Sequence, residues 1–188
     1  MLVSEPQIRE IDRRGFVRRL DPLLTTYAAA MAPPPDQMPG RRGIMERHAT
    51  YPDFRAYIAK RRRSVAGFAY GFRGETGQWW HDVVRRGLTD LGGDDHARYW
   101  MDNPFEVAEL HVHPDSQGHG LGRELVTTLC AHRTERTVVL STLDAETPAR
   151  NLYRSLGMTD LLIAFQFPGG GPDYAIMGAT LPLKDNRE

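Results

Sequence analysis

Cysteine is almost absent from this sequence, since Cys130 is the only one among 188 residues. A disulfide bond within the chain is therefore excluded, which suits a reducing compartment. The sequence also lacks any run of about 18 apolar residues, so it predicts no membrane-spanning helix. Its first residues, Met1 to Glu5, lack the basic-then-apolar order of a signal peptide. These absences together predict a cytoplasmic protein.

The chain has no surplus of charge of either sign, because its basic and its acidic residues number 24 each. A balanced charge gives no electrostatic reason to expect binding to nucleic acid or to a membrane surface. The length suits one domain with a sizeable core, and we expect a single domain over residues 1–188.

A glycine-rich turn follows an apolar run at residues 107–112 that is typical of a strand. The turn has the sequence Gln117-Gly118-His119-Gly120-Leu121-Gly122, and it leads into a helical pattern with leucines on one stripe. Glycines at a strand-to-helix turn let the backbone bend tightly, so that several N–H groups converge at the positive end of the helix dipole. This arrangement predicts a binding site for phosphate.

Two common phosphate-binding motifs do not match this turn. A P-loop requires a lysine followed by serine or threonine after the glycines, and neither pair is present. A dinucleotide-binding fingerprint requires a third glycine, where this chain has Arg123, and an acidic residue further on, where residues 138–142 offer none. Both alternatives therefore fail on specific residues.

A second motif lies about 30 residues further along the chain. Residues 137–140 form a short β-branched run that predicts a strand. Thr147 and Pro148 then have the character of an N-cap and a first helical residue. The segment 149–156 has helical spacing, and Gly157 is well placed to end the helix.

The two motifs together resemble the GNAT N-acetyltransferase superfamily. One hallmark is Gln-x-x-Gly-x-Gly, formed here by Gln117, Gly120 and Gly122, and the other is the string Ala-Arg-Asn-Leu-Tyr-Arg-Ser-Leu-Gly-Met at 149–158. The resemblance implies an α/β (α+β) fold with a mixed, mostly antiparallel sheet of six to seven strands flanked by helices. It also implies transfer of an acetyl group from acetyl-CoA to an amine by direct attack in a ternary complex. The cofactor-binding core would span 105–158, and acceptor-side elements would lie at 20–50 and 75–101.

The resemblance also assigns roles to individual residues. Tyr153 would protonate the departing thiolate of coenzyme A. The turn would hold the pyrophosphate, and the strand before it would bond the pantetheine arm. The residues that it assigns to the cofactor are Leu110, Val112, Gln117, Gly118, His119, Gly120, Leu121, Gly122, Arg123, Asn151 and Arg154. One departure concerns Glu146, which stands where many relatives have an asparagine that contacts the pantetheine arm.

The general base is less defined than the acid. A lysine-like amine with a pKa of ~10.4 is almost wholly protonated at pH 7, so a base helps to remove its proton. Strand alternation places Glu109 and His111 on one face and Glu106 on the other. We favour Glu109 as the base, followed by His111 and then by Glu106.

The rest of the chain supplies the remaining elements. We expect an irregular segment at 1–19, helices at 20–31 and 41–50, strands at 54–60, 65–72, 161–165 and 174–181, and helical pieces between 79 and 101 that Gly92-Gly93 separates. Gly67, Gly71 and Gly74 are expected to permit a bulge or a close backbone approach in the second of these strands. Trp79 and Trp80 either line an acceptor pocket or cover the core, and we assign them to the substrate site.

Other functions fit less well or remain as alternatives. His111 and His113 share a strand face, but a zinc site needs further ligands, so we expect no metal. A serine hydrolase would need a Gly-x-Ser-x-Gly motif, which is missing. The main alternative is a non-catalytic acyl-CoA-binding sensor. The acceptor is expected to be a small-molecule or peptide amine, and the terminal strands leave a homodimer open.

Overall fold

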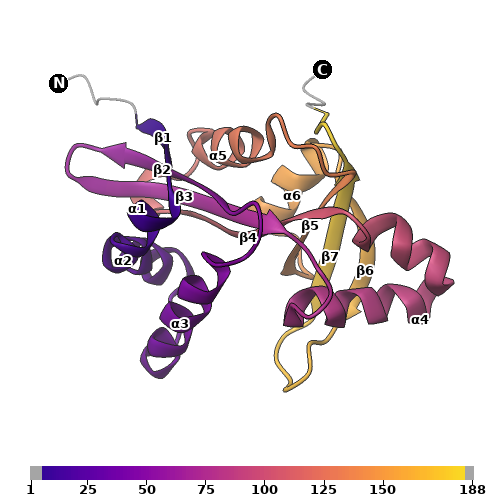
Figure 1. Cartoon of the computed structure of the whole chain (residues 1–188). Helices are drawn as coiled ribbons and strands as arrows, with labels where there is room; N and C mark the ends of the chain where they lie inside the picture. The colour runs from indigo at the N-terminus through magenta and orange to yellow at the C-terminus, as the bar shows by residue number, and fades with distance from the viewer. Residues whose placement is uncertain (1–5, 185–188) are drawn as a thin grey trace. The chain divides into compact units, whose positions relative to one another are not determined.

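The computed structural model describes residues 6–184, within which seven strands and six α-helices follow one another along the chain (Figure 1). The elements are β1 (Gln7–Ile11), α1 (Arg13–Val17), α2 (Leu20–Met31), η1 (Pro35–Gln37), α3 (Met38–His48), β2 (Arg55–Arg61), β3 (Ser64–Arg73), α4 (Trp79–Met101), β4 (Pro104–Val112), η2 (Pro114–Ser116), α5 (Leu121–Cys130), β5 (Thr137–Leu143), α6 (Pro148–Ser155), β6 (Thr159–Phe165) and β7 (Tyr174–Thr180).

The strands form one mixed sheet in the order β1-β2-β3-β4-β5-β7-β6. The pairs β1/β2, β2/β3, β5/β7 and β6/β7 are antiparallel, and the pair β4/β5 is parallel. The predicted mixed, mostly antiparallel sheet of six to seven strands with flanking helices is therefore confirmed. The chain divides into two compact units, which are described in turn: the first comprises residues 6–72 and 107–129, and the second 73–106 and 130–184.

The first unit packs α1, α2 and α3 on a hydrophobic core. Its largest wholly buried side chains include Phe16, Leu20, Leu23, Met45, Phe68 and Tyr70. The helix α2 matches its predicted bounds and ends at Ala32, which adopts a left-handed φ of 45° before the proline run. The register of β2 against β3 shifts between Ala59 and Lys60, and a Cβ on Gly67 would lie 3.0 Å from the carbonyl oxygen of His111. The prediction of a bulge or a close approach among Gly67, Gly71 and Gly74 is therefore confirmed at Gly67.

The second unit contains α4, α6 and the strands β5, β6 and β7. The helix α4 breaks at Gly93, where φ is 79° and ψ is 176°, as the glycine pair predicts. Its buried face packs against β6 and β7, and Gly87 lies so close that a Cβ would be 2.6 Å from the ring of Phe165. Thr147 caps α6 by accepting a hydrogen bond from the amide of Arg150 at 3.1 Å, which confirms the predicted N-cap.

Two expectations about the elements are wrong. Residues 7–17 are not irregular, because β1 pairs with β2 and Asp12 caps α1 by accepting from the amide of Gly15 at 2.6 Å. β1 is mostly exposed and carries charged side chains, so it shows no apolar alternation. The strand β4 also begins three residues before its predicted start at 107 and includes Glu106, whose side chain is buried. The predictions for residues 1–5 lie outside the described residues.

Candidate active site

The glycine turn of the first unit joins η2 to α5. The side-chain amide of Gln117 donates to the carbonyl oxygen of Val112 at 2.9 Å, which ties the turn to the end of β4. Gly118 and Gly120 both have left-handed φ angles, 79° and 80°, that other residues rarely adopt. Among the described residues no atom lies within 4 Å of a Cβ added at either position. The turn therefore needs these glycines for their conformation, and it borders open space.

The turn delivers the chain into α5 at Leu121. The first amides of an α-helix have no carbonyl partner within the helix, and the helix dipole is positive there. The amides of Leu121 and Gly122 are such groups, and His119 and Gly120 beside them are exposed. The residues present therefore fit a pyrophosphate group at this turn. The chain also places Arg61 nearby, since its guanidinium donates to the carbonyl oxygen of Asp115 at 3.3 Å.

Glu109 and His111, the two favoured candidates for the base, contact each other on β4. Glu109 Oε2 accepts from His111 Nε2, and Glu109 Oε1 lies 2.7 Å from Nη1 of Arg41 on α3. Burial of the Glu109 side chain opposes ionisation. The hydrogen bond and charge of His111, together with the charge of Arg41, outweigh burial and hold the pKa of Glu109 below its usual range. Both carboxylate oxygens are thus engaged in stabilising contacts.

Further polar side chains surround this pair and were not predicted from the sequence. The guanidinium of Arg41 lies 4.8 Å from the ring centroid of Tyr27, whose ring also meets that of His111 edge-on. His48 Nδ1 lies 3.0 Å from Tyr70 Oη. Burial, with the charges of Arg41 and Arg47, lowers the pKa of His48 to about 4 despite the opposing charge of Glu109. These contacts join residues far apart in the chain, so no local pattern reveals them.

The second unit carries Tyr153, which is buried on α6. One ion-pair network, in which Arg150 and Arg154 share Asp160, holds this helix. Arg150, nearly buried, contacts Asp144 and lies 3.0 Å from Asp160. Arg154 Nη1 lies 2.9 Å from Glu146 and its Nη2 3.4 Å from Asp160. Glu146, in place of the expected asparagine, therefore holds Arg154, while Asn151 is exposed on the same helix.

The tryptophan pair at the start of α4 also lies in the second unit. Trp80 packs on the core of this unit, and its Nε1 donates to Ser141 Oγ at 3.3 Å. Trp79 is 56% exposed, with its ring centroid 5.6 Å from that of Phe167. Glu106, the third candidate for the base, pairs with His81 rather than with Glu109. The sequence offers no signal for that partner except its position directly after the tryptophans.

The segments that form the glycine turn and α6 also match known proteins. A profile of the family described as "Acetyltransferase (GNAT) domain" matches residues 52–158, more than half of the chain, including the glycine turn and α6. The chain belongs to the GNAT acetyltransferase family. This GNAT protein is 43% identical over 123 residues to the GCN5-like protein acetyltransferase Rv2170 of Mycobacterium tuberculosis (strain ATCC 25618 / H37Rv). The match covers 63% of the chain and 60% of that relative.

Solved structures share the GNAT fold with this protein. The ribosomal-protein-S18-alanine N-acetyltransferase from Escherichia coli superposes with a TM-score of 0.61 at 17% identity, covering 97% of this chain and 98% of the other. The protein yncA from Salmonella typhimurium, solved with its cofactor acetyl-CoA, gives 0.60 at 20% identity, with 95% of each chain covered. At these identities the likeness extends to the fold alone.

Within residues 6–184, no helix of this GNAT protein has both the length and the apolar character needed to cross a membrane. The same range contains no cluster of three or more histidine, cysteine, aspartate or glutamate side chains that could hold a metal ion.

Proposed function

We propose that this protein transfers an acetyl group from acetyl-CoA to a primary amine by direct attack in a ternary complex. The observation that carries the proposal is the glycine turn before α5. Gly118 and Gly120 hold it in a left-handed conformation beside open space, inside the segment that matches the acetyltransferase family. Such a turn offers backbone amides to a pyrophosphate group.

The cofactor-binding residues that we propose are taken from those assigned from the sequence. The amides of residues 118–123 would bind the pyrophosphate, and the backbone of Leu110 and Val112 would bond the pantetheine arm. Acetyl-CoA would supply the activated acyl group as a thioester. Because Arg154 is engaged with Glu146, we propose that it supports α6 and that the pyrophosphate relies mainly on the turn.

The side chains would carry out two proton transfers, one from the amine and one to the departing thiolate. An amine with a pKa of ~10.4 must lose a proton at a cost of ~4.6 kcal/mol at pH 7. The departing thiol has an ordinary pKa of ~8.5, so a tyrosine near ~10 is a suitable donor. We propose Tyr153 as this acid on the strength of the helix motif.

Glu109 is less suited to the role of base than its position in the sequence implies. A carboxylate with a lowered pKa accepts a proton weakly, and its oxygens already contact Arg41 and His111. We propose instead that Glu109 positions Arg41 and His111 in the first unit.

The test is Tyr153→Phe, assayed for release of the CoA thiol with a panel of amines and for acetyl-CoA affinity. The proposal expects turnover to fall by about 10²-fold or more, with the affinity for acetyl-CoA unchanged. An acyl-CoA sensor, the alternative, would bind acetyl-CoA equally well in both forms and release no thiol with any amine. Turnover that is unchanged in the variant would contradict the role of Tyr153.

A further inference from the structure

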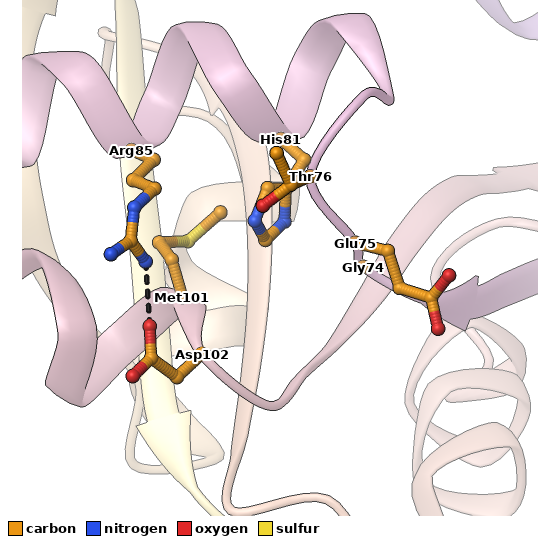
Figure 2. Close-up of a pocket in the computed structure, with 7 residues that line it drawn as sticks. All are labelled: Gly74, Glu75, Thr76, His81, Arg85, Met101 and Asp102. Carbon is orange, nitrogen blue, oxygen red and sulfur yellow. Dashed lines mark hydrogen bonds and ion pairs between the residues drawn. The ribbon is translucent and has the colours of Figure 1, made fainter.

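The second unit contains a polar cavity of about 340 Å³ between the turn that follows β3 and the two ends of α4 (Figure 2). His81 and Arg85 lie one turn apart on α4, and both side chains point toward the cavity. Thr76 and Asp102 line it from the turn and from the C-terminal end of α4. A volume of this size lies at the lower end of the range for small-ligand sites, which is about 300–1,000 Å³.

His81 is held by a carboxylate behind the cavity. Its Nδ1 lies 2.8 Å from Oε1 of Glu106 on β4, and the two side chains are only 2% and 3% exposed. A carboxylate at Nδ1 favours the tautomer with the proton on that atom, which leaves Nε2 as the basic atom of the ring. Burial raises the pKa of Glu106 above its usual range, against the hydrogen bond and charge of His81.

The pair of His81 and Glu106 packs so closely against Gly74 that no side chain fits at that position. A Cβ there would overlap the carboxylate of Glu106 and lie 2.8 Å from His81 Nδ1. The amide of Gly74 donates to the carbonyl oxygen of Pro104 at 3.0 Å, which fixes the turn against β4. The buried side chain of Gln78 donates to the carbonyl oxygen of Arg73 at 3.2 Å. The surrounding backbone therefore fixes this buried pair, which is not a contact between mobile surface groups.

The other charged groups around the imidazole have partners of their own. Arg85 lies 2.6 Å from Asp102, and Glu75 lies 2.9 Å from Arg73. Asp82, next to His81 on α4, accepts from the amide of Gly77 at 3.0 and 3.1 Å. Among the described residues that line the cavity, His81 is the imidazole, and the contact with Glu106 engages its Nδ1.

We propose that this cavity receives the amine of the acceptor and that His81, oriented by Glu106, removes its proton. The inference rests on the proposed acetyl transfer and names the base and the acceptor pocket for it. The proton moves from the ammonium group to His81 Nε2, and the nitrogen forms a bond to the acyl carbon. The carbon–sulfur bond then breaks, the thiolate takes a proton from the acid, and the attacking nitrogen returns its second proton to that acid, so the ammonium group has lost two protons when the amide is formed. His81 is thus a catalytic residue, and Glu106 is a positioning residue.

The volume and the polar lining of the cavity leave room for an alkyl primary amine such as a lysine side chain. Such an amine comes either from a free amino acid or from a peptide. Free L-lysine, Nα-acetyl-L-lysine amide and a lysine-containing hexapeptide distinguish these sources, because the two derivatives lack a free α-ammonium group on the reacting lysine. Acetylation of one or more of the three probes is the expected result with the wild type.

The central experiment measures kcat/KM for these amines from pH 6 to pH 9 in His81→Gln, in Glu106→Gln and in the matched control His96→Gln. His96 lies on the same helix and does not line the cavity. We expect His81→Gln to lower kcat/KM by about 10²–10⁴-fold and to shift the profile toward the amine's own titration near ~10. Added imidazole should restore part of the rate. Glu106→Gln should lower the rate less, and acetyl-CoA affinity should stay within about twofold.

A second variant tests the pocket without disturbing the buried pair. Thr76 is exposed in the turn, so Thr76→Trp is compatible with folding and fills part of the cavity. It should raise KM for the amines by at least about tenfold and leave acetyl-CoA affinity unchanged. This result keeps the inference testable if His81→Gln fails to fold.

Several results would overturn the inference. One is a His81→Gln enzyme that retains kcat/KM within about threefold with an unchanged pH profile. Another is a Thr76→Trp enzyme with an unchanged KM for every amine. A wild type that binds acetyl-CoA but acetylates none of the three probes also overturns it, while the coenzyme site stands. Failure of the wild type to bind acetyl-CoA would instead overturn the proposed function itself.

Discussion

Arg41 of α3 and Glu109 of β4 form an ion pair with 2.7 Å between Nη1 and Oε1, although 68 residues separate them in the chain. The carboxylate is almost fully buried, whereas the guanidinium keeps about a third of its surface exposed. Its other oxygen accepts from His111. The pair therefore fixes α3 against the strand that leads into the glycine turn.

Replacing Glu109 by glutamine should destabilise the fold by about 2 kcal/mol at pH 7, because it leaves Arg41 and His111 without their carboxylate. The pKa of Glu109 is lower in the folded chain than its ordinary value of 4.5. Its stabilisation is therefore complete above that pH and is lost as the pH falls through the folded pKa. Urea unfolding at pH 7 and near pH 3 should show the wild type and the variant converging at the lower pH. If the free energies of unfolding of the wild type and the variant differed equally at both pH values, this account would be refuted.

His48 should make the fold sensitive to acid in a higher pH range. Its pKa falls from 6.5 to about 4 in the folded chain, so the unfolded chain binds the proton more readily between these values. The wild type should therefore lose up to about 2 kcal/mol as the pH falls from 6.5 to 4, after allowance for partial exposure. In His48→Gln this loss should be absent from unfolding curves taken across the range. An equal loss of unfolding free energy in the two proteins between pH 6.5 and pH 4 would contradict a buried neutral imidazole at His48.

Local sequence signals predicted the elements that carry them. Thr147 and Pro148 marked the start of α6, and the glycine pair marked the break that the structure places at Gly93. The edge strand β1 was missed because its charged, exposed residues look like a loop. In the candidate site, the glycine turn was predictable from its glycines and from the strand and helix patterns on either side of it.

The partners of the buried carboxylates were not predictable from local patterns. Glu106 and His81 are 25 residues apart, and Glu109 and Arg41 are 68 apart. Each pair forms only when separate elements pack together, so periodicity and capping rules carry no information about it. The sequence therefore identified carboxylates on β4 as candidates for the base without revealing which of them is engaged elsewhere.

The glycine turn should tolerate substitution poorly for a conformational reason. Gly118→Ala and Gly120→Ala should each cost about 1 kcal/mol, because alanine is strained at a φ near 80° even where space is open. The matched control is Gly43→Ala in α3, where a Cβ also meets no atom within 4 Å and the backbone is helical. That change should stabilise the fold by about 0.5–1 kcal/mol. Equal effects at all three positions, measured by urea unfolding, would contradict the left-handed turn.

The two arginines of α6 should differ in importance. Arg150 is nearly buried between Asp144 and Asp160, so Arg150→Met removes the cation from Asp144 and leaves Asp160 with only its longer contact to Arg154. Arg154 is far more exposed, and its contact with Glu146 is a surface pair. Thermal unfolding should show a drop of several degrees for Arg150→Met and a much smaller one for Arg154→Met. The reverse order would contradict this account of how α6 is anchored.

The central claim, that the glycine turn binds acetyl-CoA, is tested most directly by thermal unfolding with acetyl-CoA, CoA or NAD. At 100 times its Kd a ligand adds about 2.7 kcal/mol, which corresponds to a rise of about 5–10 °C for a chain of this size. We expect this rise with acetyl-CoA and CoA, no rise with NAD, and a smaller rise in Gly120→Ala. An unchanged unfolding midpoint with both CoA species at millimolar concentration would contradict the claim.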